Sequence, residues 1–247
     1  MLAIVLLGRG GYGRIPHDQL TSLETAVSKK LTIDDATMTM VAFVEQGAPS
    51  LPDALQACAD KGATRITVLP VFVPGNENLH RWLAKVMMRW HSSWDGQSLV
   101  LQLLPSLGDS KALEEAVTAV LPQLLAETDN LLEDPPAKWE HDPKGWSRIP
   151  PHRYHLLMCR GPRCTAKGAS DMWQYLRQRL REEGLVERAN GAMMVSTSCL
   201  YPCHHAPVLV VHPDDVWYSV PTTAAVDKIV KQHLQNGRFV KEYIIQT

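Results

Sequence analysis

The sequence predicts an α/β protein made of two domains. Strand and helix signals alternate through residues 1–125, as in a parallel sheet with helices on both faces. Proline and charged residues then interrupt this alternation over residues 126–152, a composition typical of a linker. Strand and helix signals resume over residues 153–247. The length of 247 residues agrees with about two domains.

Four strand–helix units are expected in the first domain. Each strand is a short run of apolar and β-branched residues, and each helix has apolar residues three and four positions apart. The expected strands are Leu2–Leu7, Thr37–Val44, Arg65–Val73 and Leu99–Leu104, and the expected helices are Pro16–Lys30, Pro52–Lys61, Leu79–Trp90 and Ser110–Leu125. Cys58 shares a helix face with Leu51 and Leu55, which predicts a small buried side chain.

The second domain is predicted to combine strands with two amphipathic helices. The expected strands are Tyr154–Met158, Ala192–Val195, Val208–Val211 and Val216–Val220, and the expected helices are Ala169–Glu183 and Thr222–Leu234. A turn at His212–Asp215 is expected to join the last two strands as a hairpin. A short edge segment is expected at Lys241–Ile245. In the linker, Trp139 and Trp146 are expected to pack between the domains.

Four of the five cysteines form two tight pairs, each placed after an apolar run. Cys159 and Cys164 lie in MCRGPRC, and Cys199 and Cys203 lie in SCLYPC. Four thiolates in two chelating pairs suit an iron–sulfur cluster. A zinc site is one alternative, although zinc pairs commonly have two residues between the cysteines. A pair of disulfides is the other, which a cytosolic chain disfavours.

Composition restricts the classes of function. A formal net charge of −1 gives no indication of nucleic-acid binding or of an anionic membrane surface. No apolar run approaches membrane-spanning length, and the short run Leu2–Leu7 lacks the basic flank of a secretory signal. A cytoplasmic location is therefore expected.

The cysteine spacing and the words around it resemble a known family. HLLMCRGPRC, then a helix, then STSCLYPCHHAPVLVVHPDDVWYSV is similar to the thioredoxin-like 2Fe-2S ferredoxins. The resemblance covers about Arg153 to Gln246. It implies a thioredoxin-like α/β domain with a 2Fe-2S cluster held by Cys159, Cys164, Cys199 and Cys203.

The loops that follow the first three expected strands are where a parallel sheet binds ligands. The glycine-rich turn GRGGYG after the first strand matches neither the dinucleotide fingerprint nor the P-loop. Together with AFVEQGAPSLPDAL and ATRITVLPVFVPGNENLH, it resembles the class II chelatases of the sirohydrochlorin cobalt- or ferrochelatase family. The resemblance covers about Leu2 to Leu125. It implies a site for a tetrapyrrole, with two histidines that bind the incoming metal and accept pyrrole protons.

The chain departs from that family pattern at its site. Arg9 stands where the family has a loop histidine, and arginine neither coordinates metal nor accepts a proton. The second family histidine falls near Asn78, with His80 two residues later. Glu45 and His80 are the candidate catalytic residues, and His17 is a further substitute. For both His80 and His17, the alternative to a metal-binding role is an ordinary structural or solvent-exposed role.

Arginine at position 9 has two interpretations. It binds ring carboxylates together with Gly10, Gly11 and Arg14, or it forms an ion pair with Glu45 that fixes the loop. Arg81 is a further candidate for the ring carboxylates. Around the cysteines, the expected cationic residues are Arg160, Arg163 and Lys167, which either receive an acidic redox partner or form a solvated rim. His204 and His205 are expected in an exposed loop.

Two functions follow from these resemblances. The first is a chelatase of cobalamin or sirohaem synthesis that inserts Co²⁺ or Fe²⁺ into a sirohydrochlorin-like ring and carries a 2Fe-2S domain. The second is a non-catalytic electron carrier or regulator that has a degenerate, tetrapyrrole-binding chelatase domain. A redox partner protein and a homodimer are expected, and no nucleic acid or membrane.

Overall fold

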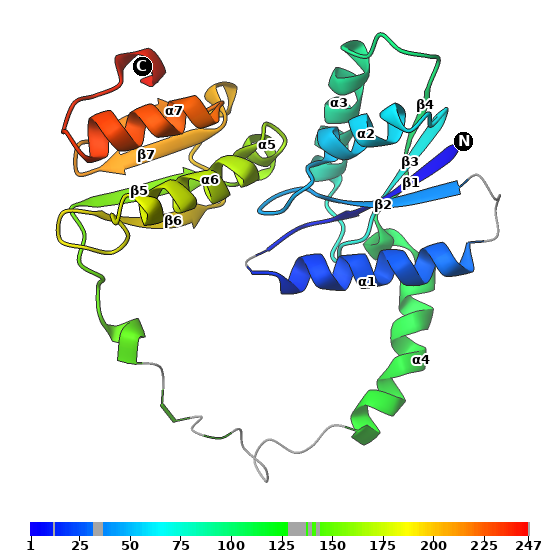
Figure 1. Ribbon diagram of the computed structural model, residues 1–247. Coiled ribbons are helices and arrows are strands. Elements are labelled where there is room, and N and C mark those ends of the chain that lie inside the picture. The colour runs from blue at the N-terminus through cyan, green and yellow to red at the C-terminus, as the bar shows by residue number, and fades with distance from the viewer. Residues whose placement is uncertain (12, 32–36, 128–136, 138–139, 142–143, 247) are drawn as a thin grey trace.

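The computed structural model describes residues 1–11, 13–31, 37–127, 137, 140–141 and 144–246. Two four-stranded sheets, each with its own helices, form two bodies (Figure 1). Much of the expected linker, including Trp139 and the side chain of Trp146, lies outside the described residues. None of the helices in the described part of the chain is long and apolar enough to cross a membrane.

The first sheet is entirely parallel, in the order β2-β1-β3-β4. Its strands are β1 (Leu2–Gly8), β2 (Thr37–Phe43), β3 (Arg65–Pro70) and β4 (Val100–Leu103), and its helices are α1 (Ile15–Lys30), α2 (Leu51–Asp60), α3 (Glu77–Ser92) and α4 (Lys111–Glu127). Helices α2 and α3 cover one face and α1 covers the other, with α4 on the α1 side (Figure 1). The alternating pattern therefore folds as predicted, with element ends that differ by at most three residues.

Local sequence signals explain where the helices of this domain begin. Ser50 caps α2, because its hydroxyl accepts a hydrogen bond from the Asp53 N–H while the Asp53 carboxylate accepts one from the Ser50 N–H. Asn76 caps α3 through the Leu79 N–H. Cys58 is fully buried between α2 and the sheet, as expected, and burial raises the pKa of its thiol to about 11.

The second sheet is mixed, in the order β6-β5-β7-β8. Its strands are β5 (Tyr154–Cys159), β6 (Ala192–Thr197), β7 (Val208–His212) and β8 (Val216–Ser219), and its helices are α5 (Pro162–Thr165), α6 (Ala169–Glu182) and α7 (Thr223–Lys228). Only β5 and β6 pair in parallel, whereas β7 and β8 form the expected hairpin. The edge segment near Lys241–Tyr243 joins β8 through one bridge, Tyr218 to Ile244.

The last expected helix changes its winding, which the apolar spacing does not predict. After α7 it continues as a π-helical turn over Ile229–Leu234. His233 in this turn is fully buried. Its Nε2 lies 2.8 Å from the Asp214 carboxylate and its Nδ1 lies 3.0 Å from the Tyr218 hydroxyl. These hydrogen bonds hold the turn over Ile229–Leu234 against β8 and the loop that precedes it.

Candidate functional site

The two cysteine loops leave the same edge of the second sheet. Strand β5 ends at Cys159, which lies opposite Thr197 at the end of its parallel neighbour β6. Parallel strands end at the same edge, so the loop that leads to Cys164 starts beside the loop that carries Cys199 and Cys203. Two cysteine pairs that lie far apart in the sequence are brought together in this way.

A glycine makes the close approach of these loops feasible. A Cβ atom at Gly161 would lie 1.7 Å from the carbonyl oxygen of Ser198, which is far inside any contact distance. The Arg160 N–H donates to the Thr197 carbonyl at 2.8 Å, and the Cys159 Sγ lies 3.8 Å from the Ser198 oxygen. The first loop is therefore packed directly on the backbone of the second.

The four cysteines have different surroundings. Cys159 and Cys164 are buried, Cys203 is half-buried and Cys199 is exposed. A hydrogen bond from the Cys164 thiol lowers the pKa of Cys159 to about 6, aided by the N–H groups of Gly161 and Leu200 and by Cys199. The same bond, together with burial, raises the pKa of Cys164. Partial desolvation of the thiol raises the pKa of Cys199, although this residue as a whole is exposed.

This donor set fits an iron–sulfur cluster. It offers four soft ligands, and backbone N–H groups that point at the Cys159 sulfur, as hydrogen bonds to cluster sulfurs do. Side-chain hydrogen bonds link the four cysteines in a chain, between Cys164 and Cys159, between Cys159 and Cys199 and between Cys199 and Cys203. Within the described ranges, no group of three or more His, Cys, Asp and Glu side chains surrounds the position of one metal ion.

In the first domain, Arg9 forms an ion pair with Glu45. The Arg9 Nε donates to the Glu45 carboxylate at 2.9 Å, and the Arg9 and Glu45 side chains are 56% and 13% exposed. Their backbones also bond, because the Glu45 N–H donates to the Arg9 carbonyl at 2.9 Å. Gly10 at φ +96° completes the contact, since a Cβ there would lie 1.7 Å from the Glu45 carbonyl oxygen. The ion-pair interpretation of Arg9 is thus the arrangement observed.

The candidate histidines have partners other than Arg9 and Glu45. The His80 Nε2 lies 3.0 Å from the Leu104 carbonyl, to which it donates. His17 stacks on Phe43 with ring centroids 5.7 Å apart. No hydrogen bond or ion pair joins Glu45 to His80, both of which belong to the described part of the chain. Each of these two candidate catalytic residues is bonded to another group, Glu45 to Arg9 and His80 to the Leu104 carbonyl.

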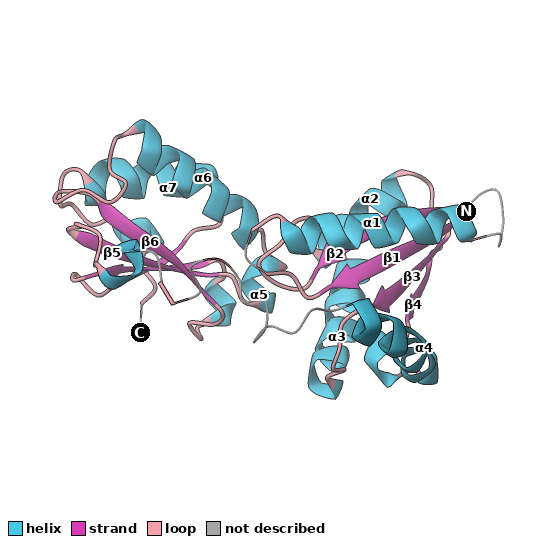
Figure 2. Ribbon diagram, turned by 90° about the horizontal axis from the view of Figure 1, so that it is seen from below, coloured by secondary structure: helices cyan, strands magenta, loops and turns pink. Residues whose placement is uncertain are grey.

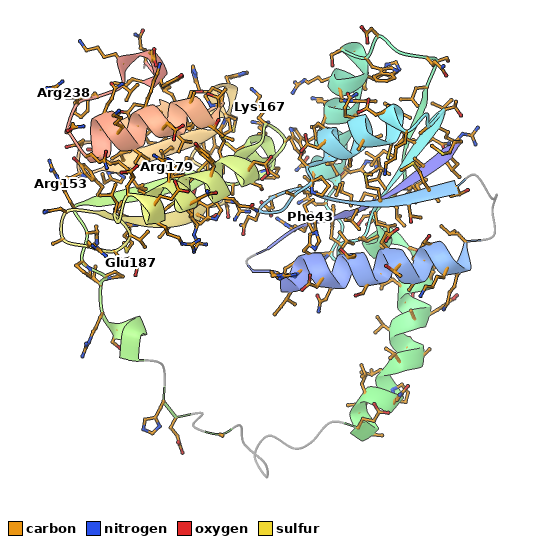
Figure 3. All side chains as sticks on the ribbon, in the orientation of Figure 1. Phe43, Arg153, Lys167, Arg179, Glu187 and Arg238 are labelled. Atoms are coloured by element: carbon orange, nitrogen blue, oxygen red, sulfur yellow. The ribbon has the colours of Figure 1, made fainter. Side chains whose placement is uncertain are left out.

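A cavity of about 380 Å³ lies beside the glycine-rich loop, and both domains line it. Gly10, Gly11 and Arg14, for which the sequence predicts ring binding, are among its lining residues. The side chains that project from the two domains are Arg14, His17 and Phe43 on one side, and Arg160, Trp173 and Arg177 on the other. Figure 3 shows Phe43 on the side of the first domain that faces the second.

Contacts between the domains build one wall of this cavity. Arg160 is buried, and its guanidinium donates to the Gln46 carbonyl at 2.5 Å, away from the expected position around the cysteines. The Gln46 N–H donates in return to the Arg160 carbonyl at 3.2 Å and the Thr165 hydroxyl at 3.2 Å. Ser170 donates to the Gly47 carbonyl at 2.7 Å. Gln46 has φ +55°, which is uncommon for a residue other than glycine.

The second domain's residues in this cavity were missed by sequence reasoning, because their role depends on how the domains pack. Arg160 is also stacked over Trp173 at 5.4 Å, and Arg177 over the same ring at 5.7 Å. His204 and His205 are exposed, as expected, and the Lys167 ammonium lies 3.4 Å from the His204 carbonyl.

Similarity to known proteins agrees with this two-part architecture. Residues 144–234 match the family model of the thioredoxin-like 2Fe-2S ferredoxins, and residues 3–124 match that of CbiX. A putative 2Fe-2S ferredoxin of Priestia megaterium is 33% identical over 93 residues, covering 38% of this chain and 70% of that protein. The chain belongs to the thioredoxin-like 2Fe-2S ferredoxin family. Its first domain is a CbiX, chelatase-like domain, as the sequence resemblance implied.

Solved structures resemble each half of this ferredoxin-family chain. A thioredoxin-like 2Fe-2S ferredoxin from Aquifex aeolicus has 26% identity to this chain and a TM-score of 0.35. The match covers 39% of this chain and 99% of the ferredoxin. A putative cobalamin biosynthesis CbiX protein from Marinobacter aquaeolei has 18% identity and a TM-score of 0.44, with coverage of 52% and 100%. The ferredoxin relatives support an iron–sulfur cluster in the second domain.

Proposed function

We propose that this protein is a 2Fe-2S electron carrier of tetrapyrrole metabolism, whose CbiX domain binds a sirohydrochlorin-like ring without inserting metal. The single observation that carries this choice is the ion pair of Arg9 with Glu45 at 2.9 Å. This ion pair engages the Glu45 carboxylate, which metal insertion would require as a base. Arg9 itself is a permanently charged group at the position where the family has a histidine.

Cys159, Cys164, Cys199 and Cys203 would hold the cluster. The cluster would supply one-electron transfer. The chain's own contribution is to hold the first two sulfurs in an apolar core while Cys199 and Cys203 reach the surface. The N–H groups of Gly161 and Leu200 stabilise negative charge on Cys159.

The cavity between the domains supports ring binding. Arg14, Arg160 and Arg177 line it, and guanidinium groups pair well with carboxylates. Gln46 also lines the cavity, although its side-chain oxygen is buried and has no hydrogen-bond partner among the described residues. The cavity volume of about 380 Å³ accommodates part of a large macrocycle with its side arms.

Insertion of Co²⁺ or Fe²⁺ is the second candidate function, and the match of residues 3–124 to CbiX favours it. A free-base ring loses two N–H protons as metal enters, which demands bases near neutral pH. Glu45 and His80 are the groups that would serve. The Arg9 and Leu104 contacts would first have to release them.

One set of assays tests both functions. Protein purified without oxygen is analysed for iron and acid-labile sulfide, and then mixed with sirohydrochlorin and Co²⁺ or Fe²⁺ while the absorption spectrum is recorded. We expect a reducible cluster and a bound ring, and metal insertion no faster than in buffer. Insertion above that background would overturn the non-catalytic proposal, and protein that contains zinc in place of iron would overturn the redox proposal.

Arg9→His gives a sharper comparison, because it restores the family residue. We expect this variant to gain metal insertion that wild type lacks, while Arg9→Lys, which keeps the charge, does not. Equal rates in all three proteins would show that Arg9 is not what prevents insertion. We also propose that the protein has a redox partner protein and forms a homodimer. Sedimentation of the purified protein tests the homodimer.

A further inference from the structure

A second, larger hollow lies between α3 and the loop of the exposed cysteines. We call it the α3 groove; its volume is about 840 Å³, within the range of sites for small ligands. It is separate from the cavity at the glycine-rich loop, because the two share none of their lining residues. Helix α5 and the body of α3 approach each other here (Figure 2).

One wall is a continuous face of α3. Arg81, Trp82, Lys85, Arg89 and Trp90 line the groove, at spacings that keep them on one side of the helix. The indole of Trp90 is fixed, since its Nε1 donates to the Gln56 side chain at 3.2 Å and its ring stacks on Trp94. The wall therefore presents cationic heads alternating with large aromatic rings.

The opposite wall is formed by the cysteine loops. Arg163 and Lys167 contribute two further cations, and Tyr201, Cys203 and His204 are among the other lining residues. Figure 3 shows Lys167 at the edge of the second domain that faces the first. The Tyr201 residue is 86% exposed. A ligand in the groove would thus lie against Cys203, one of the four sulfurs assigned to the cluster.

Charge and shape define the ligand. Five cations line the groove and no aspartate or glutamate is among its lining residues, in a chain whose formal net charge is −1. Near the groove mouth, Arg81 pairs with Glu77 at 3.2 Å, and both of these side chains are well exposed. Such a concentration of one sign of charge attracts anions, and indole rings favour flat aromatic partners.

We infer that the α3 groove binds a planar aromatic ligand that carries several carboxylates, stacked on Trp82 and Trp90 and placed against Cys203. A carboxylated tetrapyrrole is the member of this class that we select, and that selection rests on the proposed function. The groove would be a ring site beside the cysteine loop and separate from the cavity at the glycine-rich loop. Its α3 end reaches Asn78, where the second family histidine falls, so it adjoins the metal-binding position of the family.

The test measures binding of uroporphyrin, a polycarboxylate porphyrin, to the full-length cluster-containing protein, from the anisotropy of the ring's own fluorescence. Lys85→Glu/Arg89→Glu alters the groove, and Arg14→Glu/Arg177→Glu alters the other cavity. Lys111→Glu/Lys231→Glu makes the same charge change at exposed positions outside both. We expect the first variant to lose about tenfold or more in affinity, and the Lys111/Lys231 control to stay near wild type.

The aromatic wall is tested by Trp90→Phe and Trp90→Leu, with circular dichroism to confirm folding. Stacking predicts that phenylalanine keeps most of the affinity and leucine loses it. Loss of binding in the Arg14/Arg177 variant alone would overturn the groove and leave the proposed function intact. Equal losses in all three charge variants would also overturn it, because they would indicate unspecific attraction.

A non-tetrapyrrole probe separates the two proposals. Pyrenetetrasulfonate has the same flat, polyanionic character, so we expect it to bind wild type and to lose affinity in Lys85→Glu/Arg89→Glu. If it behaves so while uroporphyrin fails to bind anywhere, the groove stands and the tetrapyrrole function falls. If neither probe binds, the groove falls as well.

Discussion

Gly161 provides the most direct test of how the two cysteine loops are held together. In Gly161→Ala, the added methyl group would lie 1.7 Å from the carbonyl oxygen of Ser198. This neighbour is backbone and cannot rotate away, so the loops must separate. The φ of −66° at Gly161 suits any residue, so the whole effect is steric.

The size of that effect follows from overpacking. Forcing an extra methyl group into a filled site costs about 1–3 kcal/mol. For a domain of about a hundred residues, each kcal/mol lowers the melting temperature by about 4–8 °C. We therefore expect a fall of about 4 °C or more for the second domain, together with reduced iron and sulfide per chain, because Cys159 and Cys199 are displaced.

The assay compares Gly161→Ala with Gly145→Ala. A Cβ atom at Gly145 meets nothing within 4 Å, so this control adds the same methyl group to open space. Melting is followed by circular dichroism, and the cluster by iron, sulfide and electron paramagnetic resonance after reduction. If Gly161→Ala matched the control in both melting temperature and iron content, the direct packing of the loops would be refuted.

Three further predictions concern single contacts. The pKa of Cys58 is raised to about 11, so its neutral thiol is favoured in the folded state and stability should fall as pH rises from about 9 to 11. Urea unfolding of wild type and Cys58→Ala over that range checks this, and parallel curves would contradict it. Ser50→Ala should cost about 1 kcal/mol through loss of the α2 cap, whereas Ser50→Asp should keep most of the stability. In Arg160→Met the Gln46 carbonyl loses its donor, so we expect the domains to melt in two separate steps; a single unchanged transition in calorimetry would refute the coupling.

The sequence was most informative where a local pattern decides the structure. The apolar runs before Cys159 and Cys199 end as neighbouring strands, so the convergence of the cysteine loops followed from the placement of each pair after a strand. The alternation of strands and helices likewise predicted the first sheet. Cys58 was correctly expected in the core because it shares a face with other apolar residues.

Long-range packing set the limit of prediction. Arg160 follows a cysteine directly, and its sequence position suggested a place near the cluster, yet its guanidinium reaches Gln46 across the domain boundary. The sequence could offer an ion pair as one interpretation of Arg9 but could not choose it. The face of α3 contains regularly spaced cations and tryptophans, but only the position of the second domain turns it into a groove.

The reciprocal bonds between Gln46 and Arg160 have a practical consequence for work on either half. If the two domains were separated, the Gln46 and Gly47 carbonyls would lose their hydrogen-bond donors. The Arg160 guanidinium, which lies over Trp173, would become exposed. A fragment of the first domain would therefore expose the Gln46 and Gly47 backbone without these donors, and a fragment of the second domain would expose the Arg160 side chain. Assays on isolated halves would report on molecules that differ from the intact chain at the very wall where the lobes meet.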